Sequence, residues 1–503
     1  MVDSHVPVLV GAAQFTQRKN ETVFLDPMGL MVKTALMAIN DTKKPGIKDA
    51  VDTVYVVNVQ TLTYEDAPGM LAGRLGMTPK IFFYSGLGGN TPQKLLNKAA
   101  KAIAAGESRA VLISGGEAMY SLRRAIRGEI SLDWPTSQPP KTIDELEKKS
   151  VNDMEAAFGL ELPVYMYPLF ETALRGASGR NLESHRRYMG RICRHLSRVA
   201  SENPHSWNQT PRSADELTLP SPENRYIAYP YTKQMVANMY VDQGASLIMT
   251  SAAVAQELGI DPALWVYPMG GADLCDIWNV SQRPKIHEAP ALGMAARSAL
   301  DQAGIGLSDI RVFDFYSCFP CAVEMGRRSV GLDENDPRDL SVTGGLSYFG
   351  GPMNNYSLHS VASMVDWIRS NPSGYGLVTS VGWYMTKHAV MVYGKRPGKI
   401  SWREKTADNG LQKEVDDRAL PGPVEKAEGP LTVEAYTVIH GRKGDPKRGI
   451  VIGRMKDGQR AIAEIDGDGE ILLRCEETEL VGQTGAVRYD TGSNKNRVKF
   501  ENL

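Results

Sequence analysis

FFYSGLGGNTPQKLLNKAAKAIAAGESRAVLISGGEAM, residues 82–119, is the stretch of sequence that decides the fold. Its Thr-Pro pair at 91–92 is a typical helix start, and apolar residues recur at helical spacing until Gly106, so the sequence predicts one buried helix. A short apolar strand at 110–114 then runs into two glycines. The partial positive charge at the helix N-terminus would therefore face any ligand beside the glycine loop at 88–90.

Strands and helices alternate on both sides of this stretch. Expected strands lie at 7–14, 51–59, 311–315 and 377–381, and expected helices lie at 26–40, 290–304 and 355–369. Such alternation predicts an α/β fold with a mainly parallel sheet that is covered on both faces. Because the second half again places a glycine turn before a central helix, the pattern indicates two copies of one α/β unit.

Length and composition exclude several classes of protein. The 57 Lys and Arg residues nearly balance the 58 Asp and Glu residues, so no overall field would recruit nucleic acid or an anionic membrane. Five cysteines, an odd number, favour a reducing compartment and argue against a disulfide framework or a zinc site, so no metal is expected. No apolar run reaches the roughly 18 residues that a membrane span needs, and we expect a cytoplasmic protein.

The C-terminal region differs in character from the rest. Residues 399–430 mix charge, proline and glycine and are typical of a linker. Short alternating strands separated by turns are expected after it, at 431–440, 449–455, 460–465, 470–475 and 485–489. They predict a small antiparallel β-barrel, which is OB-like. The barrel lacks the stripe of aromatic and basic residues that nucleic-acid binding needs, so a protein partner is the alternative it leaves open.

The order of these elements and the GGEAM sequence at 115–119 resemble a thiolase, an enzyme that makes or breaks carbon–carbon bonds on acyl-CoA thioesters. The appended barrel resembles the extra C-terminal domain of type-1 thiolase-like proteins, which stand near the sterol-carrier-protein thiolases. The resemblance implies a duplicated five-layered body with a loop domain inserted in its first half. The implied parts are an N-terminal half (1–119 and 228–265), an insertion (120–227), a C-terminal half (266–398), the linker (399–430) and the barrel (431–503).

Three residues that thiolases use for catalysis are replaced in this chain. The resemblance places the nucleophilic cysteine at Gly89, the histidine at Gly351 and the second cysteine at Gly382. We therefore do not expect a thiolase condensation by its usual covalent route, which requires an activated thiol.

Other reactive residues remain in the loops that the resemblance brings together. Cys318 is the candidate nucleophile, His359 or His388 is the candidate base, and Tyr316 is a further catalytic candidate. The cysteine and the histidines also have a structural interpretation, as a small buried residue or as hydrogen-bond partners of the backbone.

The expected ligand contacts come from backbone amides and from arginines. The amides at 89–90 would hold a thioester oxygen. The arginines lie in a basic, helix-like segment of the insertion and would hold CoA phosphates or form a solvated helix face. The candidate binding residues are Gly89, Asn90, Gly350, Gly351, Asn355, Arg186 and Arg187.

The leading hypothesis is an acyl-CoA-binding protein of lipid metabolism that acts as an acyltransferase similar to acetyl-CoA acetyltransferase, with a rebuilt site. One alternative is a non-catalytic acyl-CoA or lipid-binding module. Another is a lyase that cleaves a β-hydroxyacyl-CoA by retro-aldol chemistry, since related thiolase-like aldolases rely on tyrosines and Tyr316 begins its loop. Coenzyme A thioester is the substrate or ligand, and no covalently bound cofactor is expected. Thiolases pair through a strand at 81–84, so we expect a homodimer, or a monomer if the barrel covers that edge.

Overall fold

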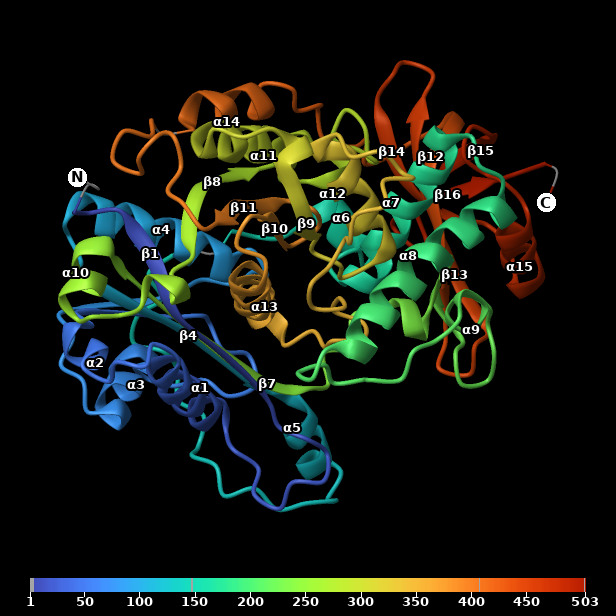
Figure 1. Ribbon diagram of the computed structural model, residues 1–503. Coiled ribbons are helices and arrows are strands. Elements are labelled where there is room, and N and C mark those ends of the chain that lie inside the picture. Colours follow the sequence, from blue (N-terminus) through green and yellow to red (C-terminus); the bar gives the residue numbers. More distant parts are fainter. Residues whose placement is uncertain (1–3, 146–147, 407, 502) are drawn as a thin grey trace.

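Two mixed β-sheets with two central helices between them form the body of the chain (Figure 1). The computed structural model describes residues 4–145, 148–406, 408–501 and 503. Helices cover the outer face of each sheet, so the layers run helix, sheet, helix, sheet, helix. This arrangement confirms the duplicated five-layered α/β fold that the sequence predicts.

The two sheets share one strand pattern. The first contains β1 (Pro7–Thr16), β2 (Thr53–Val56), β3 (Ile81–Tyr84), β4 (Ala110–Ala118) and β7 (Asp242–Ser251), in the order β1-β7-β4-β2-β3. The second contains β8 (Tyr267–Cys275), β9 (Ile310–Asp314), β10 (Tyr375–Gly382) and β11 (Lys387–Gly394), in the order β8-β11-β10-β9. In each sheet one strand, β7 or β11, runs antiparallel to both of its neighbours, and the others run in one direction.

The central layer consists of α4 (Thr91–Ala105) and α13 (Tyr356–Ser370), which pack against each other and against both sheets. α4 ends at Gly106, whose left-handed φ of 77° a residue with a side chain rarely adopts. The outer helices of the first half are α1 (Pro27–Asp41), α2 (Ile47–Ala50), α3 (Ala67–Leu75) and α10 (Ala252–Glu257), and those of the second half are α11 (Pro290–Ala303) and α12 (Pro320–Val330). Their apolar stripes bury the outer faces of the sheets.

The insertion that follows β4 is mostly helical. It contains α5 (Met119–Ile126), α6 (Asp153–Ala157), α7 (Pro163–Ser178), α8 (Leu182–Glu202) and α9 (Ala214–Thr218). It ends in two short strands, β5 (Tyr226–Ala228) and β6 (Tyr231–Thr232), which belong to the same sheet as the C-terminal barrel. The insertion and the barrel therefore share one sheet, although the whole second half separates them in the sequence.

The C-terminal barrel is closed by five strands. They are β12 (Gly429–His440), β13 (Pro446–Met455), β14 (Arg460–Ile465), β15 (Thr484–Asp490) and β16 (Lys495–Lys499), in the closed order β12-β13-β14-β16-β15-β12. This confirms the small OB-like barrel, but the pair of β14 with β16 is parallel, so the barrel is not antiparallel throughout.

One expected barrel strand is wrong. The segment at 470–475 lies inside helix α15 (Gly469–Glu477). Asp468 caps this helix, because its carboxylate accepts hydrogen bonds from the amides of Glu470 and Ile471. Leu472 and Cys475, three residues apart, are the buried side chains of the helix. The fifth strand of the barrel is instead β16, which has no counterpart among the expected strands.

The linker at 399–430 is packed against the body. It contains α14 (Asn409–Asp416), which contacts α11 and β8. Trp402 is buried, and its Nε1 donates to the Pro268 carbonyl at 2.6 Å. Gln412 Oε1 accepts from the Cys275 amide at 2.7 Å. Short 3₁₀ turns complete the secondary structure, at 233–235, 262–264, 280–282, 307–309 and 353–355.

Arg175 joins the insertion to the barrel. Its side chain on α7 is 1% exposed, and Nε and Nη2 donate to the two oxygens of Glu479 at 2.6 and 3.0 Å. Nη2 also donates to the Tyr436 hydroxyl at 2.8 Å, and Nη1 donates to the Tyr229 hydroxyl at 3.3 Å. One buried guanidinium thus holds α7 to strand β12 and to the segment after α15.

The outer edge of β3 is partly covered by the chain's own segment at 138–145. The Asp144 amide donates to the Tyr84 carbonyl at 2.9 Å, and its carboxylate accepts from the Tyr84 amide at 2.6 Å. Glu145 accepts from the Gly86 amide at 3.0 Å. This segment, rather than the barrel, covers the edge, while Ile81 stays 42% exposed. Among the helices that the structure describes, none has the length and apolar character of a membrane span.

Candidate functional site

The glycine loop before α4 is held by the start of α13. The Gly88 amide donates to Asn354 Oδ1 at 2.9 Å, and the Ser357 hydroxyl donates to the Gly89 carbonyl at 2.9 Å. Asn354 also donates through Nδ2 to the Asn58 carbonyl at 3.0 Å. Loops from the two halves of the body therefore meet at Gly88 and Gly89, as the resemblance to thiolases implies.

The hydroxyl of Tyr316 fills the space beside Gly89, the position that the resemblance assigns to the thiolase nucleophile. A Cβ atom built on Gly89 would lie 2.0 Å from Tyr316 Oη and 2.6 Å from the carbonyl oxygen of Val381. Tyr316 follows β9, its amide donates to Thr379 Oγ1 at 3.0 Å, and its ring meets that of Tyr356 edge-on at 5.5 Å. No side chain fits at Gly89 while this tyrosine is in place.

Tyr316 is a neutral phenol at ordinary pH. Burial in the first place, and then the nearby Cys318 and Tyr356, hold the pKa of its hydroxyl well above its usual value. A neutral hydroxyl of this kind donates a hydrogen bond or a proton, and it is a poor base.

The side chain of Asn90 lies against Gly382, the position that the resemblance assigns to the second thiolase cysteine. Its Oδ1 lies 2.4 Å from the Cβ position of Gly382 and 2.6 Å from that of Gly88, and Lys387 Cε lies 3.0 Å from both. This oxygen is buried, and no hydrogen-bond partner is described for it. The same is true of both polar atoms of the buried Asn355 side chain, next to Gly115. Two carboxamides thus remain available to a ligand, since buried polar groups are normally paired.

Gly351, the position of the thiolase histidine, has more room. A Cβ atom there would lie 3.5 Å from the Asn238 carbonyl oxygen and from Leu346, which is ordinary contact. The neighbouring Gly350 has a φ of 125°, and Gln243 Oε1 lies 2.4 Å from its Cβ position. Of these two candidate binding residues, only Gly351 would accept a small side chain without displacing a neighbour.

Cys318 is a buried thiol. Burial raises the pKa of its thiol to about 12, so almost no thiolate exists at neutral pH. It also begins a Cys-Phe-Pro-Cys sequence with Cys321 at the start of α12, a spacing that the sequence analysis did not use. Both residues are free thiols. This environment is unsuited to the activated nucleophile expected at Cys318.

His359 lies on α13, away from Tyr316. Its Nδ1 is 3.1 Å from Gln14 Oε1, and the rings of Phe349 and Tyr356 stand between it and Tyr316. Burial first, and then His205, lower the pKa of His359 to about 3. Its imidazole is therefore too weak a base for the role expected from the sequence.

His388 faces away from the glycine loop. Its Nε2 lies 2.8 Å from Asp276 Oδ2, and Asp276 Oδ1 accepts from the Ala291 amide at the start of α11, on the outer side of the sheet. Successive residues of a strand point to opposite faces. Its neighbour Lys387 accordingly faces inward and donates to the Leu87 carbonyl. The structure brings Lys387 to the loop and leaves His388 outside it.

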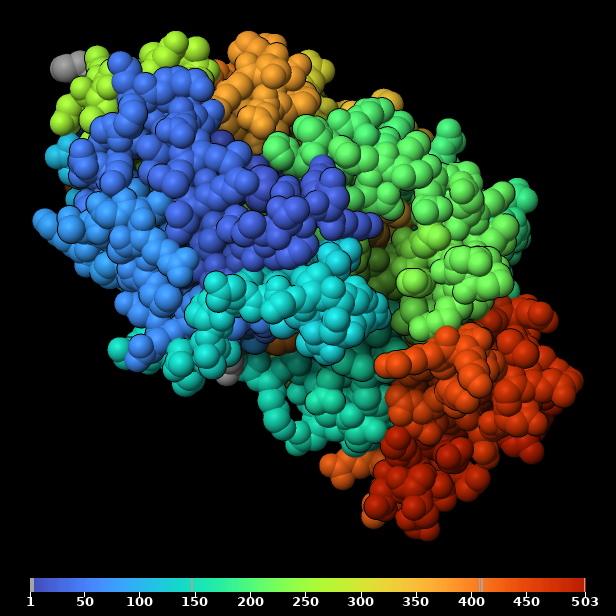
Figure 2. Space-filling view, turned by 90° about the horizontal axis from the view of Figure 1, so that it is seen from below, coloured from blue at the N-terminus to red at the C-terminus, as the bar shows by residue number. Residues whose placement is uncertain are grey.

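A large basic cavity lies beside these loops, between α5, the segment after α8 and the barrel. It has a volume of about 1210 Å³, and Figure 2 shows the hollow between the cyan atoms of α5 and the green atoms of residues 205–240. Tyr120 and Trp207 meet edge-on in its wall at 4.9 Å. Eight basic and two acidic residues line it: Lys19, Arg123, Arg124, Arg127, Arg212, Arg225, Lys233 and Arg442, with Glu129 and Glu223.

One strip of backbone, residues 237–238, lies between the cavity and the loops that carry Cys318 and Gly351. The Asn238 carbonyl accepts from the Gly351 amide at 2.9 Å, and the Asn238 amide donates to the Leu346 carbonyl at 3.0 Å. The Ala237 amide donates to the Cys318 carbonyl at 3.2 Å. Ala237 and Asn238 also line the cavity, so they separate it from the Cys318 and Gly351 loops.

The two arginines expected to hold CoA lie elsewhere. Arg186 is paired with Glu183 at 2.8 Å and with Asp215 at 3.0 Å, and Arg187 is paired with Glu183 at 2.8 Å on the exposed side of α8. Neither is among the described residues that line the cavity. The sequence signal for the lining of this cavity is the group of arginines at 123–127, shortly after the GGEAM sequence.

Glu117 is a titratable residue that the sequence analysis also missed. It is buried at the end of β4, and it accepts from the Gln60 amide at 2.7 Å and from the Thr61 amide and hydroxyl at 2.8 and 2.5 Å. Burial raises the pKa of its carboxyl to about 7 despite these donors. It orders the loop after β2, which carries Asn58.

Two comparisons with known proteins identify the family. A family model described as the thiolase-like protein type 1 additional C-terminal domain matches residues 410–492. The solved structure of a monomeric SCP2-thiolase-like protein type 1 from Mycobacterium smegmatis is 32% identical, with a TM-score of 0.84 over 99% of this chain and 99% of that one. The chain belongs to the SCP2-thiolase-like protein type 1 family.

The body of this type-1 thiolase-like protein is shared more widely. The Ltp2–ChsH2(DUF35) aldolase is 19% identical over 78% of this chain and 98% of that one, with a TM-score of 0.59. An acetyl-CoA acetyltransferase from Syntrophomonas wolfei is 14% identical over 78% of this chain and 100% of that one, with a TM-score of 0.56. These two likenesses show the fold alone. No curated protein sequence matches the chain.

Proposed function

We propose that this type-1 thiolase-like protein binds a coenzyme A thioester, with the nucleotide in the basic cavity and the acyl group at the glycine loop. The observation that carries the proposal is the charge of the cavity. Eight cationic side chains and two carboxylates line it, although the net charge of the whole chain is −1. Arginine binds phosphate oxygens through paired hydrogen bonds, and coenzyme A carries three phosphate groups. The aromatic rings of Tyr120 and Trp207 offer a surface on which a purine base would stack.

The short separation between the cavity and the loops at Cys318 and Gly351, a single strip of backbone at 237–238, supports a thioester rather than a free nucleotide. Asn238 separates the cavity from Gly351, and Cys318, Gly89 and Tyr316 lie behind the same wall. The pantetheine arm would pass this strip of backbone, and the unpaired carboxamides of Asn90 and Asn355 would meet its polar end.

Coenzyme A binding is expected to depend on Arg123, a cavity residue that packs on the ring of Tyr240 at 3.9 Å. Arg123→Glu should weaken binding about tenfold or more, because it removes a charge-assisted hydrogen bond and adds a repelling charge. The matched control is Arg187→Glu, which reverses a charge outside the cavity and should leave affinity unchanged. Isothermal titration with coenzyme A at two salt concentrations measures both. An equal loss in the two variants, or no binding by the unmodified protein, would contradict the cavity as the site.

A second candidate function is carbon–carbon cleavage of a β-hydroxyacyl-CoA, and the position of Tyr316 favours it over thiol-based acyl transfer. The bond between Cα and Cβ would break, its electron pair would form the enolate of the shortened thioester, and the hydroxyl proton would pass to solvent as an aldehyde or ketone leaves. The neutral Tyr316 hydroxyl would donate a hydrogen bond to the enolate oxygen and then a proton to Cα.

Tyr316→Phe is expected to reduce aldehyde or ketone release at least about 100-fold while coenzyme A binding stays within about twofold, because one positioned proton donor is lost. Tyr375→Phe, at the far end of β10, is the control and should retain the full rate. Release of carbonyl product is measured with a coupled dehydrogenase. Equal rates for Tyr316→Phe and the unmodified protein would rule out this role, and so would no release from any β-hydroxyacyl-CoA tested.

A further inference from the structure

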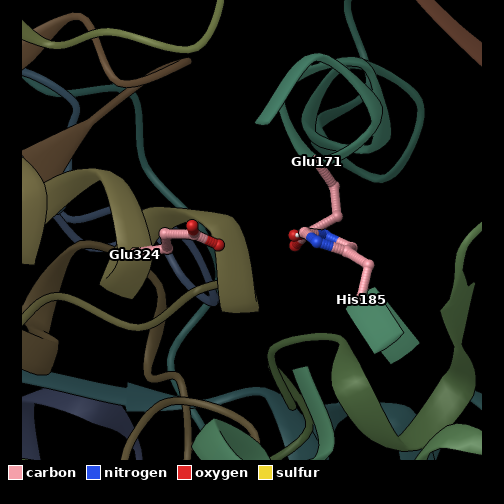
Figure 3. A group of neighbouring side chains, drawn as sticks. All are labelled: Glu171, His185 and Glu324. Carbon is pink, nitrogen blue, oxygen red and sulfur yellow. Dashed lines mark hydrogen bonds and ion pairs between the residues drawn. The ribbon is translucent and has the colours of Figure 1, made fainter. Parts of the chain in front are cut away.

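Three buried side chains converge where the insertion packs on the second half of the body. Glu171 comes from α7, His185 from α8 and Glu324 from α12 (Figure 3). Their side chains are 0, 1 and 2% exposed. One ligand atom of each lies within 4.8 Å of those of the other two. This cluster lies outside the basic cavity and uses none of the residues of the glycine loop.

The hydrogen bonds of the cluster are incomplete. His185 Nε2 lies 2.6 Å from Glu171 Oε1, and the Tyr231 hydroxyl donates to Glu171 Oε2 at 2.6 Å. Arg180 donates to Glu324 Oε1 at 3.1 Å and also pairs with Glu334. The second oxygen of Glu324 is buried, and no partner is described for it. Figure 3 shows its carboxylate directed toward the other two side chains.

A buried carboxylate oxygen without a donor is unfavourable, and two carboxylates in one buried site repel each other. Two arginines lie near Glu324, and neither is fully committed to it. Arg180 also pairs with Glu334. Arg328 lies 3.6 Å from Glu324, and its side chain is 45% exposed. A cation between Glu171 and Glu324 would remove the repulsion and satisfy the open oxygen.

We propose that Glu171, His185 and Glu324 bind one divalent first-row transition metal ion. One imidazole and two carboxylates form a donor set that suits zinc, manganese or ferrous iron. Tyr231 and Arg180 hydrogen-bond the two carboxylates from outside, the kind of contact that orients metal ligands. The ligand atoms of the three residues lie up to 4.8 Å from one another. Atoms that bind one ion at roughly 2.0–2.2 Å lie closer together, so Glu324 would turn inward by a side-chain rotation.

The ion would join two consecutive helices of the insertion to one helix of the second half. α7 and α8 belong to the insertion, and α12 directly follows the Cys318 loop. Metal binding would therefore stabilise the packing of the insertion on the second half. It would not take part in the chemistry at Tyr316.

The test is a metal titration of the full chain after dialysis against a chelator. With zinc, we expect one ion per chain and a higher melting temperature by calorimetry. Cobalt should give the absorption bands of an oxygen- and nitrogen-bound ion. Glu324→Gln keeps the shape of the side chain and the acceptor for Arg180, and it should weaken zinc binding at least about tenfold. Glu334→Gln also alters an Arg180 partner but supplies no ligand, and its zinc affinity should stay within about twofold of the unmodified value.

Three outcomes would overturn the proposal: no stoichiometric zinc on the unmodified chain, equal affinity in Glu324→Gln, or a cobalt spectrum with a thiolate charge-transfer band, which would place the ion on cysteines. A circular dichroism spectrum of each variant separates loss of the site from loss of the fold. Because the unmodified chain is titrated as well, the proposal remains falsifiable if a variant does not fold. None of these readouts depends on coenzyme A binding.

Discussion

Gly89→Ala is expected to destabilise the protein by about 3 kcal/mol, at the upper end of the usual cost of overpacking a core. The new methyl group would lie 2.0 Å from the Tyr316 hydroxyl and 2.6 Å from the Val381 carbonyl oxygen, and the second of these is backbone that cannot turn aside. Gly351→Ala is the matched control, because its Cβ would meet only ordinary contacts at 3.5 Å. Urea denaturation and calorimetry measure both variants.

A combination of substitutions tests the cause. Adding Tyr316→Phe to Gly89→Ala removes the closest of three clashing atoms and leaves the ring carbon Cζ and the Val381 carbonyl oxygen, both at 2.6 Å. The double variant should therefore recover part of the lost stability, and the two effects should not add. Similar stability of Gly89→Ala and Gly351→Ala would show that the Tyr316 hydroxyl does not occupy the nucleophile position in solution.

Arg175→Ala is expected to cost about 2 to 3 kcal/mol, below the range for a fully buried ion pair because the Glu479 side chain is 36% exposed. The change would remove the guanidinium donor from Glu479 Oε2 and from two buried tyrosine hydroxyls, while Glu479 Oε1 would keep the Val481 amide as its donor. Because these groups lie on the barrel and on the turn between β5 and β6, we expect the barrel to loosen first. Limited proteolysis should then release fragments cut near 429.

The control for Arg175 is an exposed arginine of the barrel region. Arg474→Ala removes an exposed pair with Glu470 within α15, and such pairs contribute less than about 0.5 kcal/mol. Equal melting temperatures for Arg175→Ala and the unmodified chain would show that the buried guanidinium does not hold the insertion to the barrel.

The sequence predicts the body well because its helices carry long, regular signals. For α4 the signals are the helical spacing of apolar residues, a proline at the start and a glycine at the end. The helix begins at Thr91 and ends at Ala105, within one residue of the predicted bounds. The short segment at 470–475 carries no such signal, since Ile471, Leu472 and Leu473 fit a strand or a helix equally well. The cap by Asp468 and the packing of Leu472 decide for the helix, and the second of these depends on tertiary structure.

The site is predicted in part. The sequence places Gly89, Tyr316, Cys318 and Gly351 in loops that do meet. It does not show which of two neighbours on β11 faces inward, and so it selects His388 where the structure presents Lys387. The basic cavity draws on segments between residues 19 and 442, which no local pattern connects.

The proposed cluster opposes the expectation of no metal, which considers only the cysteines of the chain. Its three residues are separated by 14 and by 139 positions in the sequence, and two of them are glutamates. Spacing motifs capture metal sites built from one loop or one helix, whereas three helices supply this one.

Because β5 pairs with β12, a chain that ends before the barrel would lose part of this sheet. Ending the polypeptide before α14 would strip Ala228 of its sheet neighbour Ile439 and remove Arg442 from the cavity wall. Backbone amide and carbonyl groups at 226–232 would then be exposed, and they would hydrogen-bond to water or pair with a strand of another molecule. We therefore expect the body and the insertion of this chain to depend on the barrel for a complete sheet and a complete cavity wall.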